Sequence, residues 1–360
     1  MHNPAQSLGT LVHPHQLDVQ EFGSYALVID ARSPREFAED HLPGAVNLPV
    51  VNNDEYAEVG TLHRTDTHAA YLIGVKYALR NIADQIESVV SRYAPRDRVL
   101  VYCFRGGKRS RLWADALHTI GFKVDVLSGG WKRYRRWVRD GLESLPRTFN
   151  FKVLAGPTGC GKTRLLIELD RQGQQVLELE GLARHRGSLL GDIPGRPQPS
   201  QKLFDSHVLS RLRSFDPQRP VWLEAESKRI GNVQLPNALY EAMHRSPMLS
   251  LVVPMSERVR LWREDYPHFV ADPSAMVEKL APLKPLIGGE ELERWRALAF
   301  AKRTDELFEC VMVAHYDPCY ARSTSKHYGP PQTHEALQLA SLCQEALEIV
   351  AARLGQEEGD

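Results

Sequence analysis

The sequence has few cysteines, no long apolar run and no excess of charge of either sign. Its five cysteines are an odd number and lack the paired spacing of a zinc site. Free thiols are typical of a reducing compartment, so a disulfide scaffold is excluded and we expect a cytoplasmic protein. No apolar run approaches the ~20 residues of a membrane helix, and the N-terminus lacks a signal-peptide pattern. We therefore expect no membrane partner.

Net charge gives no indication of a nucleic-acid partner, because lysine plus arginine and aspartate plus glutamate each number 45. The distribution of charge does give one: residues 105–139 contain ten Lys or Arg and two acids. Cations can neutralise phosphates, and aromatic rings can stack on bases. The candidates for this role alternate with aromatics and are Lys132, Arg133, Arg135 and Arg136.

The same segment also fits an amphipathic helix. Its core face would consist of Trp131, Tyr134, Trp137 and Val138, which follow helical spacing. The two interpretations are compatible if the aromatics point inward and the cations face a polyanion.

A length of 360 residues predicts two domains. We place them at residues 1–142 and 143–360, with 144–148 as the linker and a helical C-terminal extension. In the second domain the apolar runs predict strands at 149–154, 176–180, 220–226, 249–254 and 309–314, and helices at 273–309 and 333–354.

The segment 99–110 combines a short apolar strand, a cysteine, a glycine-rich loop and the start of a helical pattern. Backbone N–H groups, the positive end of a helix and nearby cations all favour the thiolate of Cys103, which is the nucleophilic form. Arg105 and Arg109 lie in the same loop, which could also hold an anion. A buried structural cysteine is the alternative, but two glycines and three cations within seven residues favour a functional site.

The first domain resembles the rhodanese family, in which a loop cysteine accepts a chalcogen atom as a persulfide and passes it on. The resemblance covers about residues 12–140 and is carried by Asp30, Arg32, Glu36, Phe37, His41, Pro43, Gly44, Ala45, Asn47, Pro49, Val126–Trp131 and the cysteine loop. From Cys103 to Arg109 the spacing is C-x5-R, one residue longer than usual. Since rhodanese-like phosphatases share that spacing, a phosphatase is an alternative.

Residues 50–94 are longer than a minimal rhodanese linker. The pattern predicts a helix over 66–80, with Tyr71, Val75, Ala78 and Leu79 on one face. We interpret this helix as a packing insertion rather than a binding element.

The second domain begins with a complete phosphate-binding loop between a predicted strand and a predicted helix. Gly156, Gly159 and Gly161 allow the backbone to wrap an anion, and Lys162 reaches the outer phosphates. Thr163 could bind Mg²⁺ if a nucleotide is used.

Four further cations follow the next predicted strands, and each could contact an anion or lie on a solvated loop. They are Arg184, Arg186, Lys228 and Arg229. Glu224 and Glu226 end a strand where an acid of a nucleotide-binding site is usual, but an aspartate is the commoner residue there.

Six strings of this chain together resemble the tRNA 2-selenouridine synthase family. They are Tyr102–Ser110, Gly159–Thr163, Leu179–Ser188, Gln198–Gln201, Glu226–Gly231 and His315–Pro318. The resemblance implies an α/β fold with a rhodanese-like parallel-sheet domain, a P-loop NTPase-like domain and a helical C-terminal part. It also implies a transferase that replaces sulfur by selenium at C2 of 2-thiouridine at the tRNA wobble position, U34.

The implied co-substrates are selenophosphate and geranyl diphosphate, the latter giving an S-geranylated intermediate. In this scheme the P-loop and the four further cations bind the diphosphate, and Cys103 carries selenium as S-selanylcysteine in the cup of Arg105 and Arg109. Direct attack by selenophosphate, with Cys103 assisting, is the alternative. Phe104 or Trp131 would stack on the unpaired base. The sequence is compatible with a monomer.

Three other functions fit parts of the sequence. An ATP-dependent RNA kinase or sulfurtransferase would use the P-loop, and a phosphatase would use the C-x5-R loop. A non-catalytic tRNA-binding module would bind with a steep salt dependence and leave the nucleoside unchanged.

Overall fold

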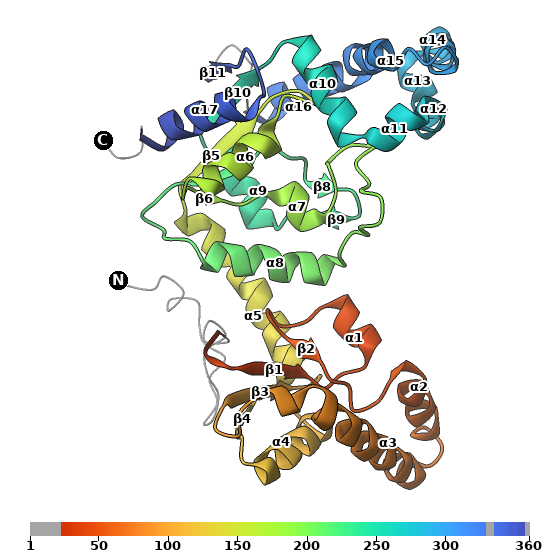
Figure 1. The fold of residues 1–360 in the computed structure, drawn as a ribbon, viewed down its shortest axis with the longest axis vertical. Helices are drawn as coiled ribbons and strands as arrows, with labels where there is room; N and C mark the ends of the chain where they lie inside the picture. The colour runs from red at the N-terminus through yellow and green to blue at the C-terminus, as the bar shows by residue number, and fades with distance from the viewer. Residues whose placement is uncertain (1–22, 329–334, 357–360) are drawn as a thin grey trace. The chain divides into compact units, whose positions relative to one another are not determined.

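The computed structural model describes residues 23–328 and 335–356, which form two compact units, each with its own parallel sheet (Figure 1). The first unit extends to Leu145 and also includes Pro199–Ser214. Pro146–Gln198 and the chain from Phe215 onward form the second. The α/β class predicted from the sequence is confirmed. Within the described residues, no helix has the length and apolar character needed to cross a bilayer.

The sheet of the first unit has the order β2-β1-β3-β4. Its strands are β1 (Leu27–Asp30), β2 (Val46–Asn47), β3 (Arg98–Tyr102) and β4 (Lys123–Val126). β1 and β3 are short and mostly buried, as expected of parallel strands covered on both faces. Asp30 pairs with Tyr102 at their carboxyl ends, so the residue after β3, Cys103, emerges at a sheet edge.

Five longer helices belong to this part of the chain. They are α1 (Pro34–Glu39), α2 (Asn53–Leu62), α3 (Thr67–Ser88), α4 (Lys108–Ile120) and α5 (Gly130–Ser144), with 3₁₀ turns at Val90–Arg92 and Leu145–Thr148. The predicted helix at 66–80 is confirmed, but most of its predicted apolar face is not buried. Ala78 is buried, whereas Tyr71, Val75 and Leu79 are 44%, 44% and 56% exposed.

The helix α8 (Gln201–Arg213) belongs to the first unit although it follows the P-loop in sequence. It approaches α5 closely: a Cβ on Gly141 would lie 2.8 Å from Cδ1 of Leu209. The predicted core face of α5 is confirmed, because Trp131, Tyr134, Trp137 and Val138 are all buried. Residues 199–214 thus follow the predicted boundary at 142/143 in sequence but pack with the first unit.

The sheet of the second unit has the order β11-β10-β5-β7-β6 and is parallel throughout. Its strands are β5 (Phe151–Ala155), β6 (Gln175–Val176), β7 (Val221–Glu224), β10 (Met248–Val252) and β11 (Glu335–Gln338). β8 (Arg229–Ile230) and β9 (Val233–Gln234) form a separate antiparallel pair. Because β5 is central, the loop that follows it opens at the middle of the sheet edge.

A separate apolar cluster of this unit includes Trp262, Trp295 and Phe308 and is formed mainly by residues 255–316. Both this cluster and the sheet pack against helices. The helices are α6 (Lys162–Arg171), α7 (Leu179–Ala183), α9 (Asn237–His244), α10 (Met255–Asp265), α11 (Pro267–Ala271), α12 (Pro273–Leu280), α13 (Lys284–Ile287), α14 (Gly289–Phe300), α15 (Thr304–Val311), α16 (Asp317–Tyr328) and α17 (Gln344–Gln356). A 3₁₀ turn spans Ala281–Leu283, and a π-helical turn, Met312–Tyr316, joins α15 to α16.

Three predicted elements of the second unit are wrong. The strand at 309–314 is the end of α15 and the π-helical turn, because a short apolar run fits a buried helix as well as a strand. The strand at 176–180 ends at Val176, and the chain then enters α7. In the helix predicted at 333–354, residues 333–334 lie outside the described part, and β11 precedes α17.

Candidate functional site

The sulfur of Cys103 lies in a polar loop between β3 and α4. Cys103 is only 3% exposed, and its Sγ accepts a hydrogen bond from the Gly107 N–H at 3.2 Å. The Ser110 hydroxyl lies 3.3 Å from the same sulfur. The start of α5 closes around this loop, since a Cβ on Gly130 would lie 2.1 Å from the Cys103 carbonyl oxygen.

The environment of Cys103 favours its ionised form. Burial by itself raises the pKa of the thiol, but the Ser110 hydroxyl, the positive charge of Arg109 and backbone N–H groups outweigh burial, and the pKa is lowered. A lowered pKa increases the fraction of nucleophilic thiolate at a given pH.

Cys103 reaches solvent through a pocket of about 390 Å³. The residues that line it are Glu36, Tyr56, Cys103, Phe104, Arg105, Gly107, Lys108 and Arg109. The structure thus brings Arg105 and Arg109 together with the sulfur. Arg105 is exposed and lies 5.8 Å from the centre of the Phe104 ring.

Arg109 has a carboxylate partner that the sequence analysis did not assign to the site. Its guanidinium donates to both carboxylate oxygens of Glu36, at 2.6 and 3.2 Å. The pairing holds Arg109 beside the thiol and compensates part of its charge. Glu36 lies 73 residues earlier in the chain, so only its place in the rhodanese pattern indicated it.

The two aromatics proposed for base stacking lie side by side, with ring centres 5.5 Å apart. Phe104 lines the cysteine pocket, whereas Trp131 is 8% exposed and donates its Nε1–H to Asp40. Of the two, Phe104 is therefore the ring available at this pocket.

The basic candidates of α5 separate into two groups. Lys132 and Arg136 are exposed and Arg133 is half-buried, so all three present charge at the surface. Arg135 is 8% exposed and donates to the Ser206 hydroxyl and to Asp205, both on α8. The prediction that Arg135 is a surface cation is wrong, because its charge is used in packing the two helices.

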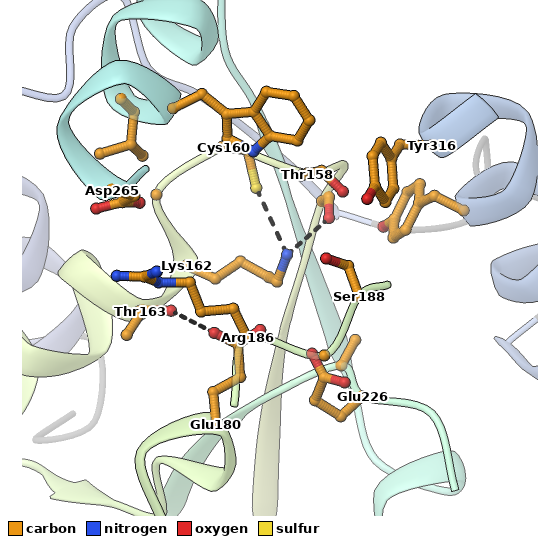
Figure 2. A pocket seen from close by; sticks show the side chains of 18 of the residues that line it. Thr158, Cys160, Lys162, Thr163, Glu180, Arg186, Ser188, Glu226, Asp265 and Tyr316 are labelled. Atoms are coloured by element: carbon orange, nitrogen blue, oxygen red, sulfur yellow. Dashed lines mark hydrogen bonds between the residues drawn. The ribbon is translucent and has the colours of Figure 1, made fainter. Parts of the chain in front are cut away.

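The second pocket lies at the P-loop and measures about 370 Å³ (Figure 2). The loop Gly156–Thr163 joins β5 to α6, and a Cβ on Gly156 would lie 2.5 Å from the Cys160 sulfur. The Lys162 ammonium donates to the Gly156 carbonyl oxygen at 2.9 Å, and the Thr163 hydroxyl donates to Glu180 at 3.2 Å.

The pocket keeps Lys162 charged in spite of its burial. Burial alone lowers the pKa of Lys162, but Cys160, Glu180 and Glu226 outweigh it and the pKa is raised. For Glu226, burial and the neighbouring Glu180 raise the pKa well above its usual range. The raised pKa of Glu226 favours its neutral form, so this acid offsets less of the positive charge that Lys162 offers to an anionic ligand.

Arg186 and Tyr320 each present a buried polar atom to this pocket. Within the described part of the chain, Arg186 Nη1 and the Tyr320 hydroxyl have no hydrogen-bond partner, and both residues line the pocket. A buried donor without a hydrogen-bond partner lowers the stability of the fold unless a ligand or a water molecule accepts its hydrogen bond. In Figure 2, Arg186 lies in the same pocket as Lys162.

Arg184, Lys228 and Arg229 do not line the P-loop pocket. Arg184 is exposed at the end of α7. Lys228 donates to the side chain of Asn237, and Arg229 donates to the Gly231 carbonyl. The pocket lining gives their predicted phosphate contacts no support.

Sequence analysis missed the aromatic wall of this pocket, which is formed by Trp262, Tyr266, Tyr316 and Tyr320. It also missed Arg258, which donates to the Thr158 carbonyl at 2.9 Å and forms an ion pair with Asp317 at 2.6 Å. Arg258 thereby connects the P-loop to α16. The His315–Pro318 string was a signal for this region, but it was expected to follow a strand at 309–314, whereas it lies in the π-helical turn and the start of α16.

Known proteins match both units. A family model of a rhodanese-like domain matches residues 16–136, and a model of the tRNA 2-selenouridine synthase AAA domain matches residues 149–281. The tRNA 2-selenouridine synthase of Aeromonas salmonicida (strain A449) is 32% identical over 325 residues, covering 81% of this chain and 86% of that protein.

Two further relatives carry the same name. The protein of Marinobacter nauticus (strain ATCC 700491 / DSM 11845 / VT8) is 30% identical, over 84% of this chain and 89% of its own length. That of Nitrosomonas europaea (strain ATCC 19718 / CIP 103999 / KCTC 2705 / NBRC 14298) is 35% identical, but the match spans less than two thirds of it, 63%, and 66% of this chain. With a cysteine loop of the rhodanese kind, a P-loop pocket and relatives matched over most of their length, the chain belongs to the tRNA 2-selenouridine synthase family.

Proposed function

We propose that this chain is a transferase that converts 2-thiouridine to 2-selenouridine at the wobble position of tRNA. The observation that carries the proposal is the presence of two chemically distinct pockets in one chain. One holds an activated thiol among cations, and the other holds a P-loop with a buried, charged lysine. The names of the relatives supply the substrate.

The first step is S-geranylation at the P-loop pocket. The thione sulfur at C2 attacks C1 of geranyl diphosphate, the C–O bond breaks, and diphosphate leaves while the base loses its N3 proton. Lys162 and Arg186 would take up the charge of the leaving group. The aromatic and aliphatic side chains of the same pocket, such as Trp262 and Leu189, suit a hydrocarbon chain.

A Mg²⁺ ion brought by the diphosphate fits one place in this pocket. Mg²⁺ commonly uses one or two carboxylates together with ligand phosphates. Thr163 and Glu180, which are hydrogen-bonded to each other beside Lys162, would hold the ion, and it would supply further positive charge. The described residues contain no cluster of three or more potential metal-ligating His, Cys, Asp or Glu side chains.

The second step is selenation at the Cys103 pocket, and its simplest balanced form is attack by selenophosphate itself. The C2–Se bond forms, the C2–S bond breaks, and geranylthiol leaves with a proton. Water then attacks phosphorus, the P–Se bond breaks, and phosphate is released. Cys103, Arg105 and Arg109 would position and activate the selenium donor.

The S-selanylcysteine predicted for Cys103 has a different electron balance. If the thiolate takes selenium, the electrons of the P–Se bond remain on phosphorus and phosphite leaves. A second thiol must then reduce the Se–S bond to release 2-selenouridine. Phosphate formed without added thiol supports direct attack, whereas phosphite with a thiol requirement supports S-selanylcysteine.

The test of the first step is Lys162→Ala, with Lys284→Ala as the control because Lys284 is exposed and does not line the pocket. We expect Lys162→Ala to lower geranylation of thiolated tRNA by at least 100-fold, the order of a lost charge-stabilising group. The control should match the wild type. An unchanged geranylation rate in Lys162→Ala would remove the P-loop from this step.

An ATP-dependent reaction is the second candidate, favoured by the complete P-loop and by Glu226 close to the end of β7. Such an enzyme would hydrolyse ATP when given tRNA, and Lys162→Ala would stop that hydrolysis. The proposed function instead requires that geranylation and selenation both proceed without ATP.

A further inference from the structure

A third cavity, of about 640 Å³, lies in the first unit between the helices α2 and α3 and the start of α4. Its lining is mainly apolar and includes Val51, Tyr56, Val59, Tyr71, Val75 and Leu112. In Figure 1, α2 and α3 lie together beside the sheet. Tyr56, Tyr71 and Val75 remain 47%, 44% and 44% exposed, so the described residues leave this apolar wall open.

The cavity adjoins the cysteine pocket, because Tyr56, Lys108 and Arg109 line both. Two of these three residues are cations that lie over aromatic rings of the cavity. The Lys108 ammonium is 3.4 Å from the centre of the Tyr71 ring, and the Arg109 guanidinium carbon is 5.6 Å from that of Tyr56. An apolar chamber, a cationic rim and the Cys103 thiol are thus continuous.

The arrangement of apolar chamber, cationic rim and thiol favours a ligand in which an apolar chain is joined to a polyanionic head. A volume of 640 Å³ falls within the range of small-molecule sites, about 300–1,000 Å³. Each methylene buried in such a chamber strengthens binding about fourfold. The cations at the rim would face phosphates outside the chamber, while the thiol pocket receives the atom that joins chain and head.

We propose that this cavity binds the prenyl chain of the S-prenylated wobble nucleoside while C2 of that nucleoside lies at the Cys103 pocket. The inference rests on the proposed function. With the chain in the cavity, the C2–S bond is directed between the two pockets, and the bond that breaks leaves the prenylthiol in the chamber. The cavity is then both the specificity site for the second step and the first resting place of the leaving group.

The test measures binding of anticodon stem-loop RNAs that carry S-methyl, five-carbon S-prenyl or ten-carbon S-geranyl thiouridine. The variants are Val75→Trp, which fills the cavity, and Leu72→Trp, on the same helix but outside it and 62% exposed. The wild type and Leu72→Trp should bind the geranylated RNA at least tenfold more tightly than the S-methyl RNA. Val75→Trp should bind all three RNAs alike.

Each of the following results would overturn the inference. One is a chain-length preference that survives in Val75→Trp. Another is a preference lost in Leu189→Trp, which alters the P-loop pocket, but not in Val75→Trp. The third is weakened binding of free geranyl diphosphate in Val75→Trp, which would assign the cavity to the prenyl donor.

Failure of the proposed function looks different. In that case the wild type would convert none of the three RNAs to 2-selenouridine when given selenophosphate, whatever their affinities. Conversion of the geranylated RNA without a chain-length preference would retain the function and remove only the cavity.

Discussion

Burial and charge act in opposite directions on Cys103, and the charge of Arg109 helps to decide the outcome. Replacing Arg109 by glutamine removes that cation and leaves Glu36 near the sulfur, and both changes raise the pKa of the thiol. We expect the pH midpoint of Cys103 alkylation by iodoacetamide to move upward by about one unit in Arg109→Gln. Selenation at neutral pH should fall in parallel.

The matched control is Arg111→Gln, since Arg111 is an exposed cation of the same helix. Its alkylation midpoint should equal that of the wild type. If Arg109→Gln leaves the midpoint unchanged or moves it downward, the electrostatic account of the thiol is wrong.

The roles of residues could be predicted where the neighbours that determine their chemistry are close in sequence. Cys103 directly follows a short strand, and Lys162 begins the helix that follows the P-loop, so their backbone surroundings could be inferred from neighbouring residues. Glu36 and Arg258 could not be assigned, because their partners lie 73 and 59 residues away. Arg135 was misassigned for the same reason: the acids that bury its charge come from α1's C-cap and from α8.

The helices α5 and α8 are joined by buried charge. Arg135 lies between Asp40, which is fully buried, and Asp205. Arg135→Met leaves both carboxylates without their cation, which should destabilise the α5–α8 packing by about 3 kcal/mol. Hydrogen exchange of the α8 amides would measure the loss, and the exposed neighbour variant Arg136→Met should show none.

The pH dependence of that loss has a definite sign. Burial raises the pKa of Asp40, and Arg135 opposes the rise. Without Arg135 the pKa rises further, so the folded state holds this proton more tightly than the unfolded chain. The loss of stability in Arg135→Met should therefore be largest at neutral pH and shrink as the pH falls toward the raised pKa of Asp40. A deficit that grows on acidification would contradict this account.

The P-loop is tied to α16 by Arg258, whose side chain is 6% exposed, and Asp317, whose side chain is 31% exposed. Asp317→Asn should cost about 2 kcal/mol locally, between the values for exposed and buried pairs. It should also raise the KM for geranyl diphosphate, because Arg258 holds the Thr158 carbonyl. Hydrogen exchange of the P-loop amides measures the local loss of stability.

Asp305→Asn is the control, because its pair with Arg263 is half exposed on both sides. It should change P-loop exchange and KM by less than about twofold. Equal effects of the two variants would remove the special role of the Arg258–Asp317 pair.

Helices and strands were predicted well where the apolar pattern was long or where neighbouring loop residues marked an end clearly. α5 shows its buried aromatic face at helical spacing, and β5 is followed at once by a glycine loop. The predicted strand at 309–314 was wrong because five apolar residues next to a helix do not reveal their period. The packing of α8 beside α5 could not be predicted, because only tertiary contacts bring the two helices together.

The two units of the chain hold the two proposed half-reactions, and the intermediate between them is a covalently modified tRNA. Such an intermediate can dissociate from one molecule and bind another. A mixture of Lys162→Ala and Cys103→Ala should therefore form 2-selenouridine although neither variant does so alone. Failure of the mixture, with both variants folded, would mean that the intermediate is not released.

The most direct measurement of the central claim is mass analysis of nucleosides from thiolated tRNA incubated with geranyl diphosphate and selenophosphate. The account predicts 2-selenouridine with the wild type. With Cys103→Ala it predicts S-geranyl-2-thiouridine that accumulates, because the first step does not use the thiol. An unchanged nucleoside with the wild type, or loss of both products in Cys103→Ala, would contradict it.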